Sequence, residues 1–120
     1  MSSQVYPIRV LLVEDETMIA MLVEDMVADL GAELVATATR LDDAVVQASE
    51  RDFDLAILDL NLAGTFTYPV ADILRQRGIP FVFATGYGTS GLAQGYENEV
   101  TLQKPFAASE LERVMQQVLA

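Results

Sequence analysis

The chain has 120 residues, which is the usual length of one globular domain. Its apolar content of 52% and charged content of 21% are typical of a folded protein with a core, and they argue against disorder. Seven basic against eighteen acidic residues give a net charge of −11, which disfavours binding to nucleic acid or anionic lipid. Cysteine and histidine are absent, so disulfides, thiolate zinc sites and imidazole bases are excluded within this chain.

Nothing in the chain predicts a membrane span. The longest uninterrupted apolar run, residues 18–23, is far shorter than the roughly 18 residues that a bilayer requires. The first residues, MSSQVYPIR, lack the basic and apolar regions of a secretory signal. We therefore expect a cytoplasmic protein.

The first half of the chain alternates between strand and helix patterns. Residues 8–13 (IRVLLV) form the nearly continuous aliphatic run of a strand buried on both faces. Residues 17–30 carry apolar side chains every three or four positions, which predicts an amphipathic helix whose apolar stripe, including Leu22, belongs to the core. Residues 33–38 predict a second strand and residues 41–51 a second helix.

The same alternation continues through the middle of the chain. Thr39 and Asp42 have the spacing of a capping box at the start of the second helix. Residues 54–58 (DLAIL) predict a third strand. Residues 69–76 predict a helix with a proline in its first turn, and Gly78 ends it.

The last third contains two further strands and a strongly amphipathic helix. Residues 80–84 (PFVFA) predict a fourth strand, and 100–103 a short fifth one. Between them, residues 86–99 contain four glycines, so any helix there should be short and mobile. The final helix has an apolar stripe for the core, and Ser109 and Glu112 have the spacing of a capping box.

Five strands alternating with helices over short connections predict an α/β fold, a five-stranded parallel sheet with helices on both faces. We expect one domain covering residues 1–120, with a core from about 8 to 119. Sites in such open sheets form at the carboxyl ends of the strands. Five chemically useful side chains follow predicted strands there: Glu14, Asp15, Asp59, Thr85 and Lys104.

These side chains fit phosphoryl transfer with a bound cation. Carboxylates a few ångströms apart repel one another unless a cation lies among them, and Mg²⁺ suits Asp15 and Asp59 as ligands, with Glu14 acting through water. Without histidine or cysteine, Asp59 on the central strand is the nucleophile that the site offers. Lys104 and Thr85 supply an ammonium and a hydroxyl for the transferring group.

Each of these residues also has an ordinary interpretation. Acids after a strand are often helix caps or solvated charges. Lys104, the only lysine of the chain, is compatible with a surface position, and Thr85 with a turn. Their coincidence at one sheet edge favours a functional site.

The ordered set of motifs resembles a response-regulator receiver domain over nearly the whole chain. LLVEDE resembles the acidic pair of the family, LAILDLNL its phosphoacceptor segment, Thr85 its hydroxyl residue and KPF, starting at Lys104, its Lys-Pro signature. The resemblance implies the flavodoxin-like topology of receivers and a role as a phosphoprotein in two-component signal transduction.

The resemblance also implies partners and roles. Asp59 would accept a phosphoryl group from the phosphohistidine of a histidine kinase or phosphotransfer protein, with self-phosphorylation and autodephosphorylation as the only chemistry. Asp15, Asp59 and the backbone carbonyl of Asn61 would hold Mg²⁺, with Glu14 assisting. Lys104 would contact the phosphoryl group.

The segment PFVFATGYG resembles a subgroup of single-domain receivers with an F-A-T-G-Y signature, which is associated with stress-response phosphorelays. Ordinary receivers carry Tyr or Phe three residues before the conserved lysine, where this chain has Thr101. We therefore expect Tyr87 to act as the switch aromatic. Phosphoryl capture by Thr85 would pull the loop in, and Gly86 and Gly88 would let its backbone move.

The chain ends after the last predicted helix, so we expect output through contacts with a downstream protein, on a face built from the fourth helix, fifth strand and fifth helix. A phosphate sink or shuttle between kinases and a docking module that works without phosphorylation are alternatives. A Mg²⁺-dependent phosphatase with an Asp nucleophile usually carries a second acid two residues later. This chain has Asn61 there, which disfavours that class of enzyme. A nucleotide-binding protein of this topology usually has a glycine-rich loop after the first strand. This chain has acids there, which would repel phosphate, so that class is disfavoured too.

Overall fold

The computed structural model describes residues 7–86 and 92–119. Its elements follow the chain as β1 (Arg9–Val13), α1 (Thr17–Asp29), β2 (Glu33–Ala38), α2 (Leu41–Glu50), β3 (Leu55–Asp59), β4 (Asn61–Leu62), β5 (Thr65–Phe66), α3 (Tyr68–Arg77), β6 (Phe81–Thr85), β7 (Thr101–Gln103) and α4 (Ala108–Leu119). Within these ranges, none of the helices combines the length and the apolar character needed to cross a membrane.

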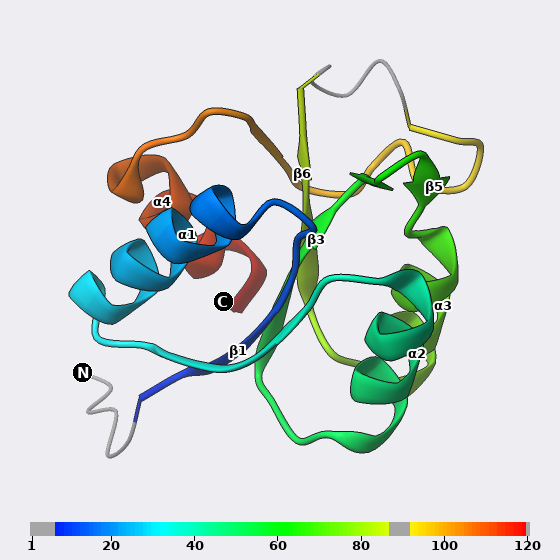
Figure 1. Cartoon of the computed structure of the whole chain (residues 1–120), viewed down its shortest axis with the longest axis horizontal. Helices are drawn as coiled ribbons and strands as arrows, with labels where there is room; N and C mark the ends of the chain where they lie inside the picture. The colour runs from blue at the N-terminus through cyan, green and yellow to red at the C-terminus, as the bar shows by residue number, and fades with distance from the viewer. Residues whose placement is uncertain (1–6, 87–91, 120) are drawn as a thin grey trace.

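Five strands form one parallel sheet in the order β2-β1-β3-β6-β7. Helices α1 and α4 cover one face, and α2 and α3 cover the other (Figure 1). The predicted class, a five-stranded parallel sheet with helices on both faces, is confirmed. Strand β3 lies at the centre and all five of its residues are buried, as its continuous apolar run predicts.

The sheet separates two apolar clusters because successive side chains of a strand point to opposite faces. Leu11, Leu58 and Phe83 pack in the cluster under α2 and α3. Leu12 and Ile57 pack in the cluster under α1 and α4. Burial on both faces fixes the register of the strands, since a shift by one residue would exchange the two sets. The ends of the strands are therefore held in fixed relative positions.

The predicted cap of α2 is wrong. The helix is preceded by Arg40 in an extended conformation, and no side chain caps it. The carboxylate of Asp42 instead pairs with the guanidinium of Arg40 at 3.2 Å, which takes it away from the role expected with Thr39.

The predicted cap of α4 is also wrong, by two residues. The helix begins at Ala108, so Ser109 already lies within its first turn. The Glu110 carboxylate accepts a hydrogen bond of 2.9 Å from the N–H of Ala107, which is the reciprocal half of a capping box. Glu110 rather than Glu112 therefore closes the start of this helix.

Helix α1 buries less of its apolar surface than predicted. Val23 and Val27 are buried, but Leu22 is 58% exposed, and its neighbours Met18 and Met21 are exposed as well. The prediction that Leu22 belongs to the core is wrong because α1 turns only a narrow face toward the sheet. Leu22 instead lines an apolar groove with Phe106, next to the end of β7.

Two features between the strands differ from the predicted alternation. Strands β4 and β5 form a short antiparallel hairpin directly after β3. Between β6 and β7, residues 92–100 form turns and no helix, so the described part of the chain contains four helices. Gly95 has a φ of 95° there, which suits a turn rather than a helix.

The corrected cap of α4 predicts a difference between two neighbouring glutamates. Glu110→Ala removes the acceptor of the Ala107 N–H and should lower the free energy of unfolding by about 0.5 to 1 kcal/mol. Glu112→Ala, on the same helix, should leave it nearly unchanged. Urea unfolding of both variants checks this, and an equal loss in the two would contradict the assignment.

Candidate acidic site at the carboxyl edge of the sheet

Four parallel strands bring chemically active side chains to one edge. Glu14 and Asp15 directly follow β1, and Asp59 is the last residue of β3. Thr85 is the last residue of β6, and Lys104 directly follows β7. The structure thus places all five residues singled out in the sequence at the carboxyl edge of the sheet.

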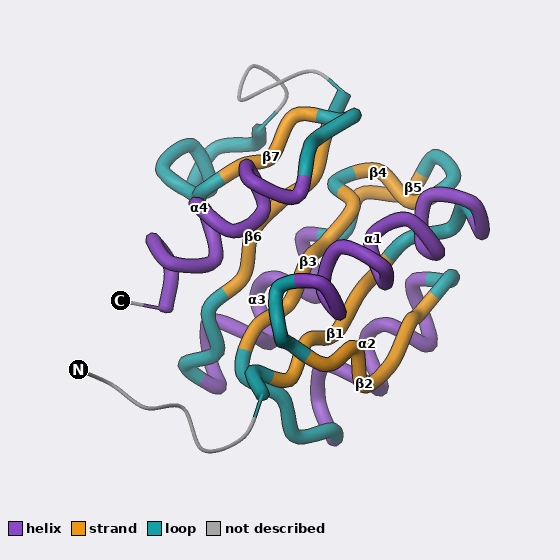
Figure 2. The backbone as a smooth tube through the Cα atoms, turned by 90° about the vertical axis from the view of Figure 1, so that its left-hand side faces the viewer, coloured by secondary structure: helices purple, strands orange, loops and turns teal. Residues whose placement is uncertain are grey.

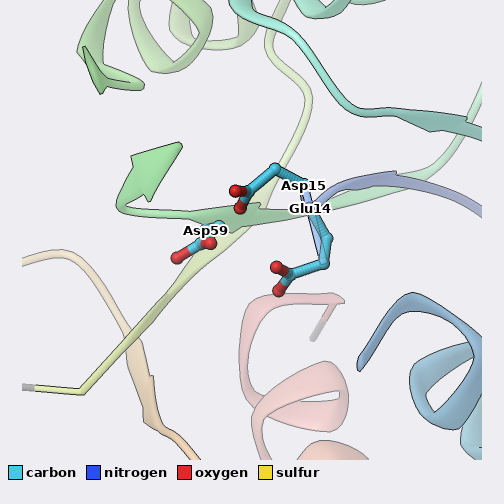
Figure 3. A group of neighbouring side chains, drawn as sticks. All are labelled: Glu14, Asp15 and Asp59. Atoms are coloured by element: carbon cyan, nitrogen blue, oxygen red, sulfur yellow. The ribbon is translucent and has the colours of Figure 1, made fainter. Parts of the chain in front are cut away.

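The three carboxylates form one group (Figure 3). Glu14, Asp15 and Asp59 each offer an oxygen, and these atoms lie within 4.8 Å of one another. Glu14 is only 3% exposed and Asp59 only 6%, whereas Asp15 is half-buried. Water therefore screens only part of the repulsion between Glu14 and Asp59.

Lys104 joins two of these acids. Its Nζ lies 3.2 Å from Glu14 Oε1 and 3.4 Å from Asp59 Oδ2. Burial opposes the charge of this ammonium, but the charges of Asp59 and Glu14 outweigh burial and raise the pKa of Lys104. The other oxygen of Glu14 accepts a hydrogen bond of 3.1 Å from the N–H of Glu16. Both oxygens of Glu14 are thus engaged, which fixes the position of its carboxylate.

The unfavourable electrostatics of the site appear in the pKa of Asp59. Burial and the charge of Glu14 raise the pKa of Asp59 from 3.8 to about 6, Asp15 adds to this, and Lys104 only partly offsets it. With all groups ionised, three negative charges face one positive charge. The site therefore favours an added cation.

A cavity of about 460 Å³ opens beside Asp59. It is lined by Asp15, Glu16, Asp59, Leu60, Asn61, Ala63, Phe66, Thr85, Gly86 and Lys104. Glu14 does not line the cavity, and its carboxylate is paired with Lys104 instead. The cavity is large enough for a phosphoryl group, and a carboxylate, an ammonium and a hydroxyl line it.

Asn61 lies on β4 at the cavity wall. Its side-chain oxygen accepts a hydrogen bond of 2.6 Å from the N–H of Gly64, so the amide is used in the hairpin turn. The role of its backbone carbonyl as a metal ligand remains a prediction.

Sequence reasoning missed Thr67, which is fully buried. Its Oγ1 donates a hydrogen bond of 2.8 Å to the backbone carbonyl of Asp59. Its own N–H donates to the carbonyl of Leu60. Thr67 therefore fixes the backbone that carries the Asp59 carboxylate. No sequence signal could have found it, because the contact depends on the β4–β5 hairpin.

The predicted switch can be placed only in part. Tyr87 and Gly88 lie outside the described residues, whereas Gly86 lines the cavity next to Thr85. Thr101, at the position of the usual aromatic, is half-buried on β7.

The comparison with protein families agrees with this geometry. Residues 10–116 match the family described as the response regulator receiver domain. The chain belongs to this family. Membership disfavours the phosphatase and the nucleotide binder, and it supports a role in signalling.

Known receivers are similar to this chain in sequence and in structure. The phyllosphere-induced regulator PhyR of Methylorubrum extorquens is 32% identical over 115 residues, which cover 92% of this chain and 43% of PhyR. The solution structure of SdrG from Sphingomonas melonis Fr1 superposes with a TM-score of 0.84 and a sequence identity of 36%. The match covers 95% of this chain and 98% of SdrG. A structure of the BeF3-activated conformation of SdrG from Pseudomonas melonis Fr1 is 35% identical with a TM-score of 0.81, covering 98% of this chain and 100% of SdrG. The chain spans about half the length of the curated relatives it matches.

The raised pKa of Asp59 predicts a pH-dependent effect of Asp59→Asn in metal-free buffer. The folded chain holds this proton more tightly than the unfolded chain does, so ionisation costs stability as the pH rises from 3.8 to about 6. Above that range, Asp59→Asn should be more stable than wild type by about 1 kcal/mol, since solvent screens part of the repulsion.

Thermal unfolding across this pH range, with a chelator present, measures the difference. Asp25→Asn, on the exposed face of α1, is the matched control and should show no such trend. An Asp59→Asn advantage that shrinks as the pH rises would contradict the assignment.

Proposed function

We propose that the protein is a phosphoacceptor switch of a two-component system or phosphorelay, with Asp59 as the acceptor. The observation that carries the proposal is the buried Asp59 carboxylate, 3.4 Å from the Lys104 ammonium at a cavity that Thr85 also lines. Residues 1–120 form one receiver domain in this proposal. Its partner upstream is a histidine kinase or a phosphotransfer protein.

The residues divide the work of phosphoryl transfer. An Asp59 oxygen forms a bond to phosphorus while the bond between phosphorus and the imidazole nitrogen of the donor breaks, and the nitrogen keeps the electron pair. The Lys104 ammonium and the Thr85 hydroxyl then hold the phosphoryl oxygens. Thr67 keeps the Asp59 backbone in place through its hydrogen bond of 2.8 Å.

The donor set fits Mg²⁺, which prefers oxygen ligands and keeps several waters. Asp15, Asp59 and the carbonyl of Asn61 would hold the ion directly. Glu14 would act through water, because its two oxygens already accept hydrogen bonds from Lys104 and the Glu16 N–H. When bound, the ion neutralises charge on the phosphoryl oxygens. The raised pKa of Asp59 supports this site, since burial and the charges of Glu14 and Asp15 cause it, and a bound cation would offset both effects.

We assign the chain to the receivers with the F-A-T-G-Y signature and to a stress response in the cytoplasm. The segment PFVFATGYG, which carries that signature, supports this assignment. Output passes through contacts with a downstream protein, without binding to nucleic acid or membrane. Tyr87 takes the role of the aromatic that is replaced by Thr101.

Incubation with Mg²⁺ and acetyl phosphate tests the phosphoacceptor. Wild type should gain the mass of one phosphoryl group, as should the Asp25→Asn control, because both keep the acceptor. Asp59→Asn should gain none. Intact-protein mass spectrometry measures the gain.

Three other outcomes are informative. Equal labelling of Asp59→Asn would place the acceptor elsewhere. A folded wild type that neither gains mass nor responds to beryllofluoride in its NMR spectrum would favour the docking module. Rapid return of the phosphoryl group to a histidine kinase would favour the sink or shuttle.

A further inference from the structure

An aromatic side chain forms part of the wall of the polar cavity. Phe66 lines the same cavity as Asp59, Thr85 and Lys104, and it is 49% exposed. An exposed Phe gives up much of the stabilisation that burial of its ring would provide. Its position beside the acceptor therefore suggests a role other than packing.

The hairpin places Phe66 at the wall of the cavity that also contains Asp59. Strand β5 pairs with β4 so that Phe66 stands opposite Asn61, which is two residues after Asp59. Strands β4 and β5, labelled in Figure 2, form a two-stranded sheet of their own. The turn has positive φ at both central residues, 52° at Ala63 and 94° at Gly64, as in a tight two-residue hairpin.

The ring of Phe66 is supported by other aromatic side chains. It stacks on the ring of Tyr68, with centroids 5.6 Å apart and planes 25° apart. Tyr68 in turn packs against Tyr96 at 4.4 Å, and its hydroxyl accepts a hydrogen bond of 2.7 Å from the N–H of Ala93. Phe66 is therefore supported by α3 and by the segment before β7, and not by the hairpin alone.

The chemistry of Phe66 differs from that of most of the cavity wall. Six of the other nine lining residues carry a carboxylate, an amide, a hydroxyl or an ammonium, and each of these groups can bind water or a phosphoryl oxygen. Leu60, Ala63 and Gly86 complete the wall. A phenyl ring offers no such hydrogen bond and displaces water from the space that it covers.

We propose that Phe66 shields the phosphorylated Asp59 from water and thereby lengthens the lifetime of the signalling state. The proposal rests on the function proposed above. In the hydrolysis, a water oxygen bonds to phosphorus and the bond from phosphorus to the Asp59 oxygen breaks. The carboxylate keeps the electron pair, and inorganic phosphate and one proton are released. Phe66 takes no part in bond making; it restricts the water.

The test separates the loss of the phosphoryl group from its uptake. Phe66→Thr keeps a residue suited to a strand but removes the ring, and Phe66→Leu keeps an apolar side chain. Val46→Thr is the control, because Val46 is similarly exposed but lies on α2 and does not line the cavity. Each protein is labelled with acetyl phosphate and Mg²⁺, freed of donor, and followed by phosphate release.

We expect Phe66→Thr to lose phosphate roughly threefold to tenfold faster than wild type. Phe66→Leu and Val46→Thr should stay close to wild type. The rate of labelling and the affinity for beryllofluoride should not change in any variant. Thermal unfolding verifies that each variant is folded, and Phe66→Ala replaces the threonine variant if that one is not.

Unchanged phosphate release in Phe66→Thr would overturn the shielding role. Labelling and release that change by the same factor would also overturn it, since Phe66 would then shape the cavity instead of restricting water. A folded wild type that takes up no phosphoryl group would refute the proposed function itself, and that result is visible before any variant is compared.

Discussion

The ion pairs of Lys104 hold the site together. One ammonium contacts Glu14 at 3.2 Å and Asp59 at 3.4 Å, joining residues from the ends of three strands. This charge is too small for the three acids around it, and burial together with Glu14 still raises the pKa of Asp59 to about 6. Without a metal, the ion pairs of Lys104 hold the site together, but they leave an excess of negative charge. That imbalance is what suits it to a cation and then to a phosphoryl group.

The fold supplies this arrangement because the strands are parallel and buried on both faces. Packing against helices on either side fixes each strand, so the residues at the strand ends need no flexible loop to meet. Thr67 adds a local restraint by binding the carbonyl of Asp59. Phe66 lies one residue before it, on the same hairpin, so one short segment both positions the acceptor and covers part of the cavity.

The sequence predicted what depends on local pattern. Apolar runs predicted β1, β3 and β6, and the acids and Lys104 after the strands predicted the site. Contacts that depend on tertiary structure were out of reach. The two capping boxes failed because Asp42 pairs with Arg40 and because α4 starts early enough for Glu110 to bind Ala107. The β4–β5 hairpin was not predicted because strands of two residues have no periodicity. Thr67 was missed as well, because its contact with Asp59 depends on this hairpin. Leu22 was predicted to lie in the core because apolar spacing alone does not show how wide a face of helix α1 the sheet covers.

The most direct test of the central claim is thermal unfolding at neutral pH with and without millimolar Mg²⁺. A ligand that binds only the folded chain raises its unfolding temperature. The account predicts a rise for wild type and for Asp25→Asn, and none for Asp15→Asn, which lacks one of the carboxylates of the site. An equal rise in all three proteins, or no rise in wild type, would contradict it.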